Sequence, residues 1–296
     1  MDRHPTPLTD RITLGPLLLD GALATALFAR GLGRDVVPDL WNVERPQEVG
    51  EVHDSHRRAG SQVLQTNTFR SNALALAERG YPGRAEEFNQ RGAAIALECA
   101  ARSPSSERPL VAGNIGPSGK QIQIDGSCQE WTDAFAQQAE ALAEAGVDYL
   151  GLETFTDLEE ARVALEAARG ATRLEVSVSL APTGSGGDLL QAGGANLTDC
   201  LRVLAAKGAT ALGLNCCTGT EVLTALPHCL AAIDRPILLR PNAGLPIEEK
   251  GTLIYPDGPE SFATPLATAV RLGAAGVGGC CGTDARHTRA LREAIG

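Results

Sequence analysis

Short apolar segments recur along the chain, and each one ends in small or polar residues. Their apolar positions are continuous rather than alternating, which is typical of parallel strands that are buried on both faces. We therefore predict eight strands, with the following bounds: Leu17–Asp20, Gln62–Asn67, Leu110–Ile115, Tyr149–Thr154, Glu175–Leu180, Ala211–Cys216, Ile237–Asn242 and Gly276–Cys281.

The segments between these strands are rich in alanine and carry apolar residues at helical spacing. Thr156 and Thr198 are candidate N-caps, because a hydroxyl can accept a hydrogen bond from a free amide of the first turn. The long interval before the second strand leaves room for one more helix near Gln47–Arg58. The clearest predicted helices are Glu130–Ala145, Asp157–Arg169, Thr198–Lys207 and Pro259–Leu272. A glycine follows three of these predicted helices, as expected where a helix ends in left-handed backbone: Gly146, Gly208 and Gly273.

Eight strand-helix units in 296 residues match the size of a (β/α)8 TIM barrel. We predict that residues 1–296 form one α/β domain of this kind. An open, doubly wound sheet is the alternative architecture, and it would not need the eighth strand. In a barrel, the functional groups lie at the carboxyl ends of the strands.

Composition and charge exclude several classes of partner. The formal net charge is −10, and an acidic surface argues against binding to nucleic acid or to anionic membranes. No run of 18 apolar residues occurs, and the first twenty residues do not have the pattern of a secretory signal. We therefore expect a cytoplasmic protein with no membrane association, in which the eight cysteines stay reduced.

Three of these cysteines lie at predicted strand ends. Cys216 closes the sixth strand, and Cys280 and Cys281 close the eighth, where flanking glycines allow the chain to leave the strand. Three thiolates suit Zn²⁺ and leave a fourth position for a substrate, as in catalytic zinc sites. The alternative is that they are buried apolar cysteines, which are common in strands. Cys217 is an additional neighbour whose side chain we expect to point elsewhere.

Two other features have an alternative explanation. His53 and His56 would share one face of a helix, but the charged segment Glu51–Arg58 around them favours a solvated surface. The glycines near the eighth strand could bind a phosphate, as many barrels do there, which would suit a metal-free lyase or aldolase. The residues Gly184–Gly187 predict a loop at the mouth of the barrel.

Several strand-end motifs carry a family resemblance that runs in order over about residues 15–295. DGALATALFARG, QTNTF, GxxGP and LETF lie at the first four strands, and GLNC, PNAGLP and GGCCGT lie at the last three. Together they resemble the homocysteine S-methyltransferase family. The motifs are most similar to those of the homocysteine-binding module of cobalamin-dependent methionine synthase, which shares TDLxEA and YPxxPExFA as well.

The resemblance implies roles for individual residues. The zinc thiolates of the family match Cys216, Cys280 and Cys281. The carboxylates that hold the homocysteine amino group match Asp20 and Glu153. The backbone amides that receive the substrate carboxylate begin at Gly21. Two amide side chains at strand ends complete the predicted substrate site: Asn215, and Asn242, which matches a residue that can fill the open metal position in the methionine synthase branch.

The predicted function is zinc-dependent transfer of a methyl group to the thiol of L-homocysteine, giving methionine. Thr154 occupies the position of a tyrosine in the betaine-using branch, which argues against betaine as the donor. S-methylmethionine, another small sulfonium compound or a methylated corrinoid are the remaining donors. A corrinoid would arrive as the free cofactor or on a separate protein. In the latter case the chain would be a methyl-acceptor subunit that is active only with that corrinoid protein.

Overall fold

A computed structural model of the chain describes residues 6–122, 124–182, 191–192, 195–249 and 252–296. The predicted loop at Gly184–Gly187 lies outside the described residues.

Eight parallel strands form one sheet in the order β1-β12-β9-β8-β5-β4-β3-β2. A parallel bridge between Leu19 and Val63 joins the two edge strands, so the sheet closes into a barrel. This confirms the predicted (β/α)8 fold and excludes the open sheet. The strands are β1 (Leu17–Leu18), β2 (Val63–Gln65), β3 (Leu110–Ile115), β4 (Tyr149–Phe155), β5 (Val176–Leu180), β8 (Ala211–Asn215), β9 (Ile237–Arg240) and β12 (Gly276–Val277).

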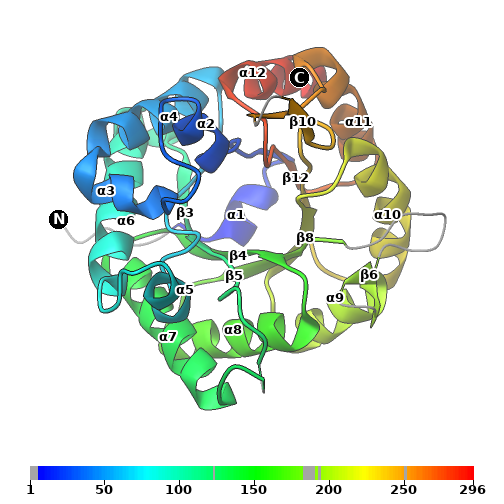
Figure 1. The fold of residues 1–296 in the computed structure, drawn as a ribbon. Coiled ribbons are helices and arrows are strands. Elements are labelled where there is room, and N and C mark those ends of the chain that lie inside the picture. The colour runs from blue at the N-terminus through cyan, green and yellow to red at the C-terminus, as the bar shows by residue number, and fades with distance from the viewer. Residues whose placement is uncertain (1–5, 123, 183–190, 193–194, 250–251) are drawn as a thin grey trace.

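Helices form a ring around the strands, as Figure 1 shows. The additional helix predicted before the second strand is present as α4. The helices are α1 (Leu8–Ile12), α2 (Ala24–Phe28), α3 (Trp41–Glu44), α4 (Pro46–Ala59), α5 (Ala73–Glu78), α6 (Ala85–Ala101), α7 (Cys128–Glu144), α8 (Leu158–Ala171), α9 (Leu197–Ala206), α10 (Gly219–Ala232), α11 (Pro259–Leu272) and α12 (Ala285–Ile295), with the 3-10 turns η1 (Pro38–Leu40) and η2 (Ser105–Glu107).

The two predicted N-caps are wrong by one or two residues. Asp157, not Thr156, caps α8, because its carboxylate accepts the amide hydrogen of Glu160. Asn196 caps α9 by accepting from the amides of Thr198 and Asp199, and the Thr198 hydroxyl also donates to it. The predicted helix ends are confirmed, since the backbone is left-handed at Gly146, Gly208 and Gly273.

The short helix α1 covers the end of the barrel at which the strands begin. Leu8 of α1 is fully buried in a cluster with side chains from inside the barrel, such as Leu110 and Tyr149. The backbone amide of Thr9 donates to Glu175 at 3.0 Å, which fixes the helix to the strand entrance. The entrance is therefore covered, and in barrels of this kind the functional groups lie at the opposite end, where the strands terminate.

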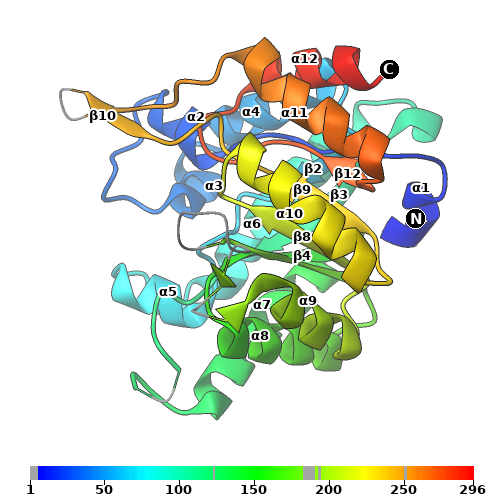
Figure 2. The same cartoon turned by 90° about the vertical axis from the view of Figure 1, so that its right-hand side faces the viewer.

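A two-stranded hairpin, β10 (Ile247–Glu249) and β11 (Thr252–Ile254), extends from that opposite end, as Figure 2 shows. A second small hairpin pairs β6 (Gln191–Ala192) with β7 (Ala195–Asn196) ahead of α9. Within the described residues, no helix combines the length and the apolar character that crossing a bilayer requires.

Candidate metal and substrate site

The structure brings the three predicted thiols together at the mouth of the barrel. The sulfur atoms of Cys216, Cys280 and Cys281 all lie within 4.8 Å of one another. The Sγ–Sγ distance is 2.9 Å between Cys216 and Cys280 and 4.0 Å between Cys280 and Cys281. All three side chains are partly exposed, so the cluster is reachable from the mouth.

The backbone leaves the regular strand at each of these cysteines. β8 ends at Asn215, and Cys216 then takes a left-handed φ of +56°. β12 ends at Val277, so Cys280 and Cys281 stand beyond the strand, and Gly282 follows them with a φ of +82°. A left-handed conformation costs a non-glycine residue about 1–3 kcal/mol and persists only where the surroundings enforce it.

The electrostatics of the cluster favour a single negative charge in the absence of a cation. Hydrogen bonds from Cys216 and Cys280 lower the pKa of the Cys281 thiol to about 3. The same contacts, together with burial, raise the pKa of Cys216 well above its usual value. A divalent cation with affinity for sulfur would allow all three thiols to ionise, and such a donor set fits Zn²⁺.

The remaining cysteines have other surroundings. Cys217 is 3% exposed and packs in the main hydrophobic core, as the sequence predicted for its side chain. Its backbone oxygen accepts a hydrogen bond from the Asn242 amide at 2.7 Å. All eight cysteines are free thiols, and the other four lie on helices: Cys99, Cys128, Cys200 and Cys229.

Two buried carboxylates lie beside the thiols and share one arginine. Arg240, the last residue of β9, contacts Asp20 Oδ1 through Nη2 at 2.8 Å and Glu153 Oε1 through Nε at 3.3 Å. The other oxygen of Asp20 accepts the amide hydrogen of Gln65 at 2.8 Å. Burial raises the pKa of Glu153 to about 7, although the Arg240 charge opposes that shift.

Arg240 was not among the residues predicted from sequence. The signal that could have identified it is an arginine that ends the apolar run Ile237–Arg240, because a charge buried in a barrel needs a carboxylate partner. A buried ion pair explains part of the placement of Asp20 and Glu153. It also holds two carboxylates close together at the barrel mouth.

The two predicted amide side chains have different surroundings. Asn215 is fully buried, and its side-chain Nδ2 donates to Thr154 Oγ1 at 2.6 Å. Asn242 is nearly buried, and its Oδ1 has no hydrogen-bond partner among the described residues. An unpartnered buried oxygen is uncommon, and it leaves Asn242 with an unused hydrogen-bond acceptor.

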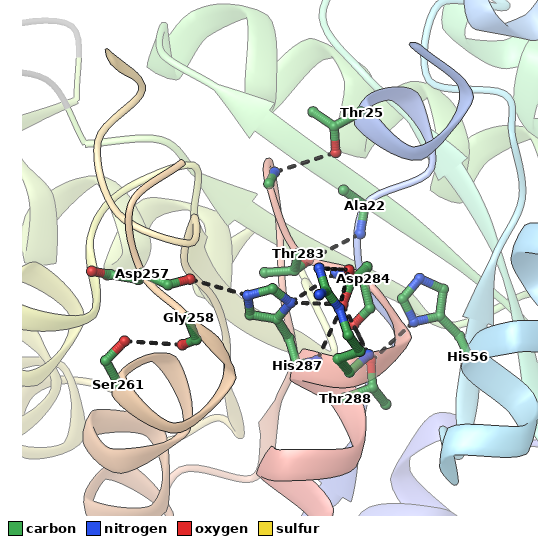
Figure 3. A network of polar contacts seen from close by, with 12 residues as sticks. Ala22, Thr25, His56, Asp257, Gly258, Ser261, Thr283, Asp284, His287 and Thr288 are labelled. Atoms are coloured by element: carbon green, nitrogen blue, oxygen red, sulfur yellow. Dashed lines mark hydrogen bonds and ion pairs between the residues drawn. The ribbon is translucent and has the colours of Figure 1, made fainter. Parts of the chain in front are cut away.

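Gly21 lies where β1 meets the loop that carries Cys280 and Cys281. A side chain at Gly21 would approach the His56 ring to 2.6 Å and the Thr283 hydroxyl to 2.7 Å, so only glycine fits. The Thr283 hydroxyl accepts the amide hydrogen of Ala22 at 3.1 Å and donates to the Cys280 carbonyl at 2.7 Å. Figure 3 shows the contact between Ala22 and Thr283 within a larger polar network at the start of α12.

The prediction that His53 and His56 lie on a solvated surface is wrong. Each is 1% exposed, and His56 Nδ1 lies 2.9 Å from the Thr288 hydroxyl of α12. Burial lowers the pKa of His53 to about 4, so that imidazole is neutral at pH 7. The charged neighbours are misleading because Asp54, itself buried, pairs with Arg57 and Arg58, so these charges do not indicate a solvated face.

Tyr255 is a further residue of the site, and it is not among those predicted from sequence. It follows β11, and its hydroxyl forms a hydrogen bond to the Cys281 sulfur that lowers the pKa of that thiol. Its ring packs against Gly282, where a side chain would come within 2.2 Å of it. The available signal is the motif that begins at Tyr255, which contributes to the family resemblance without indicating a role for the tyrosine.

The glycines near the eighth strand serve close packing. A side chain at Gly276 would approach Leu238 to 2.8 Å, and one at Gly278 would approach Leu19 to 2.6 Å. The backbone amides of Gly278 and Gly279 donate to the carbonyls of Leu239 and Asp20, so these two amides are not free to bind a phosphate.

Comparison with known proteins then identifies the family. The sequence model of the family described as "Homocysteine S-methyltransferase" matches residues 17–295. The chain belongs to the homocysteine S-methyltransferase family. This confirms the resemblance found from the strand-end motifs and places the chain among methyltransferases.

Individual relatives agree with the family. Methionine synthase of Mycobacterium tuberculosis is 30% identical over 312 residues, which cover 99% of this chain and 26% of that protein. Methionine synthase of Mycobacterium leprae is 28% identical over 310 residues, with 99% and 25% covered. The chain therefore spans about a quarter of the length of these relatives.

Solved structures match over the whole barrel. The metallated form of the homocysteine methyltransferase MmuM from Escherichia coli has a TM-score of 0.80 and 27% identity, covering 97% of this chain and 99% of that chain. The carboxyl transferase domain of Rhizobium etli pyruvate carboxylase, with a TM-score of 0.55 and 12% identity, shares the fold alone.

Proposed function

We propose that residues 1–296 form one homocysteine-binding domain that transfers a methyl group to the thiol of L-homocysteine, giving methionine, with zinc as the metal. One observation carries the proposal: three thiols converge beside a buried carboxylate pair at the mouth of a barrel of this family. The homologue MmuM has been solved in a metallated form, which supports a metal at the thiols.

Cys216, Cys280 and Cys281 would hold the zinc ion and leave one position open to the substrate sulfur. A bound zinc ion supplies positive charge that keeps the substrate thiol deprotonated at neutral pH, where a free alkyl thiol, with a pKa of about 8.5, is mostly protonated. The thiolate can then attack the methyl group in line. The new sulfur–carbon bond would form as the bond between the methyl carbon and the donor breaks, and the donor would leave with that electron pair, as a neutral thioether in the case of a sulfonium compound, so the transfer step needs no general base.

The remaining residues would orient the amino acid part of homocysteine. The carboxylates of Asp20 and Glu153 accept hydrogen bonds from the substrate ammonium group, which replaces part of the contact with Arg240. The backbone amide of Gly21 donates to the substrate carboxylate. The unused oxygen of Asn242 would fill the open metal position before the substrate arrives, as the family resemblance implies.

The methyl donor is a small sulfonium compound such as S-methylmethionine, or a methylated corrinoid. Thr154 stands where the betaine-using branch has a tyrosine, which disfavours betaine. Because three free thiols must stay reduced to bind zinc, we place the activity in the cytoplasm.

Metal analysis of single variants tests the site. We expect one zinc per wild-type chain. The variants Cys216→Ser, Cys280→Ser and Cys281→Ser should each lose zinc and at least about 100-fold in activity, since even outer-shell changes cost 10–100-fold. Cys217→Ala is the matched control and should retain both. Full activity in zinc-free protein would contradict the proposal.

A panel of donors separates the two forms of the proposal. Homocysteine is incubated with S-methylmethionine, betaine, methylcobalamin or methyltetrahydrofolate, and methionine is measured. Turnover with a small sulfonium donor alone would contradict the subunit that needs a corrinoid protein. Turnover only with a methylated corrinoid would contradict the sulfonium-dependent enzyme.

A further inference from the structure

The side chain of Asn215 joins two strands that are not neighbours in the sheet. The Thr154 backbone amide donates to Asn215 Oδ1 at 3.0 Å, and Asn215 Nδ2 donates to Thr154 Oγ1 at 2.6 Å. Thr154 lies near the end of β4 and Asn215 ends β8, with β5 between these strands. The ladder hydrogen bonds of the sheet therefore do not impose this contact.

Backbone strain is concentrated at the same place. Across the described part of the chain, Thr154 and Cys216 are the two non-glycine residues with a positive φ, at +65° and +56°. For a β-branched residue such as threonine this is a genuine outlier. Strained residues of this kind persist where neighbouring contacts over-determine them, and they cluster at functional sites.

The contact connects the two halves of the proposed site. Glu153 precedes Thr154, and Cys216 follows Asn215. The Cys216 sulfur lies 3.8 Å from both Thr154 Oγ1 and Asn215 Nδ2, so it rests against the contact. The sequence predicted Asn215 as a substrate contact, yet its side chain is fully buried and bonded to Thr154.

We infer that Asn215 and Thr154 are positioning residues. Their side chains form a clamp that directs the Cys216 sulfur toward Cys280 and Cys281 and fixes its position relative to Glu153. This inference rests on the proposed metal site. Without the clamp, Cys216 can return to the extended conformation of a strand end, which turns its side chain away from the other two thiols. The metal site then loses one ligand in part of the molecules.

The test measures Zn²⁺ affinity by competition with a chromophoric chelator. Thr154→Val keeps the branched shape and removes the hydroxyl that accepts from Asn215. Its Zn²⁺ affinity should fall about 10-fold or more, as for other residues that orient metal ligands. Thr154→Ser restores the hydroxyl and should bind Zn²⁺ within about 3-fold of wild type, because only a methyl group is lost.

Thr288→Val is the matched control. It also removes a buried hydroxyl that contacts a side-chain nitrogen of another element, here His56 Nδ1 at 2.9 Å. A general loss of stability should lower the thermal midpoint of both valine variants, whereas only Thr154→Val should lose Zn²⁺ affinity. Equal Zn²⁺ affinity in wild type and Thr154→Val would overturn the clamp.

A second readout separates the clamp from the metal site on which it rests. If the wild-type chain binds no Zn²⁺, the metal site is wrong and the clamp falls with it. If wild type binds Zn²⁺ and Thr154→Ser loses as much affinity as Thr154→Val, only the clamp is wrong. In the expected case, added Zn²⁺ at saturating concentration restores kcat in Thr154→Val. The KM for homocysteine stays raised, because Glu153 is no longer held at its position beside the thiols.

Discussion

The two sides of the thiol cluster are built by opposite means. On the β8 side, a non-glycine residue is forced into a left-handed conformation and held there by the side chains of Asn215 and Thr154. On the β12 side, glycines remove side chains, and the loop of Cys280 and Cys281 packs closely on its neighbours. The β8 side therefore depends on hydrogen bonds between side chains. The β12 side depends on glycines, whose lack of a side chain lets the loop pack closely.

The β12 side has a broad polar anchor at the start of α12. The Asp284 side chain accepts from the amides of Arg286 and His287, and His287 Nε2 lies 3.1 Å from the Asp257 carbonyl. Figure 3 shows that Thr283 and His56 extend these contacts to the β1 loop and to α4. Because many elements share this anchor, damage there should unfold the protein, whereas damage to the clamp should chiefly weaken metal binding.

The largest effect is expected from a side chain at Gly282. Gly282→Ala would bring a Cβ within 2.2 Å of Tyr255 at a φ of +82°. The free energy of unfolding should fall by about 4 kcal/mol, combining overpacking with the cost of a left-handed alanine. Chemical denaturation measures this change, and zinc binding should be lost in the same variant.

Gly31→Ala is the control for this prediction. Gly31 has a φ of +97° with nothing within 4 Å of an added Cβ, so only the conformational cost applies. It should lose about 1 kcal/mol and keep its zinc. Equal losses in the two variants would mean that the close packing on Tyr255 is unimportant.

The next effect concerns acid pH, because the β12 side contains buried imidazoles and no histidine is among the described contacts of the clamp. The pKa of His53 is lowered to about 4, mainly by burial, while the nearby Asp20 opposes the shift. As the pH falls, His53 therefore takes up a proton near pH 6.5 in the unfolded state but only near pH 4 in the folded state. Stability from this residue is complete above pH 6.5 and falls by about 3 kcal/mol as the pH drops to 4.

Denaturant unfolding of wild type and His53→Leu across this pH range measures the contribution. The variant should lose less stability than wild type between pH 6.5 and 4. Identical pH profiles would show that His53 is not the buried group responsible.

The smallest effect is expected from the hydroxyl of Thr283. Thr283 is 2% exposed, and its hydroxyl accepts the amide hydrogen of Ala22 at 3.1 Å. Thr283→Val removes that acceptor. The free energy of unfolding should fall by about 1 kcal/mol, because the Ala22 amide is a partly buried donor that loses its acceptor. Thr283→Ser should recover most of this loss. A valine variant with wild-type stability would argue that the anchor does not need this contact.

The barrel was predictable because its eight strands are buried on both faces and so appear as continuous apolar runs. Local signals also identified left-handed helix ends such as Gly146. The N-caps were less accessible, because Thr156 and Asp157 are both competent caps and the local geometry selects between them.

The pairing of charges was beyond the sequence. Arg240 meets Asp20 across 220 positions, and an arginine at the end of an apolar run indicates a buried charge without indicating which carboxylate pairs with it. His53 and His56 lie among charged residues of α4 that pair with one another. The prediction of a site at the strand ends needed only the topology of a barrel, whereas its supporting contacts needed the three-dimensional structure.

The closure of the barrel gives Asp20 a second importance. The seam between β1 and β2 has one ladder bridge, Leu19 to Val63, and the Gln62 side chain accepts the amide hydrogen of Leu18. Asp20 continues this seam by accepting the amide hydrogen of Gln65 at 2.8 Å. The Asp20 carboxylate therefore contributes to closure of the barrel. The residue that we propose to bind the substrate ammonium group also connects the first strand of the barrel to the second. Binding of a ligand at Asp20 would therefore act on the contact between β1 and β2, where a single backbone bridge closes the barrel.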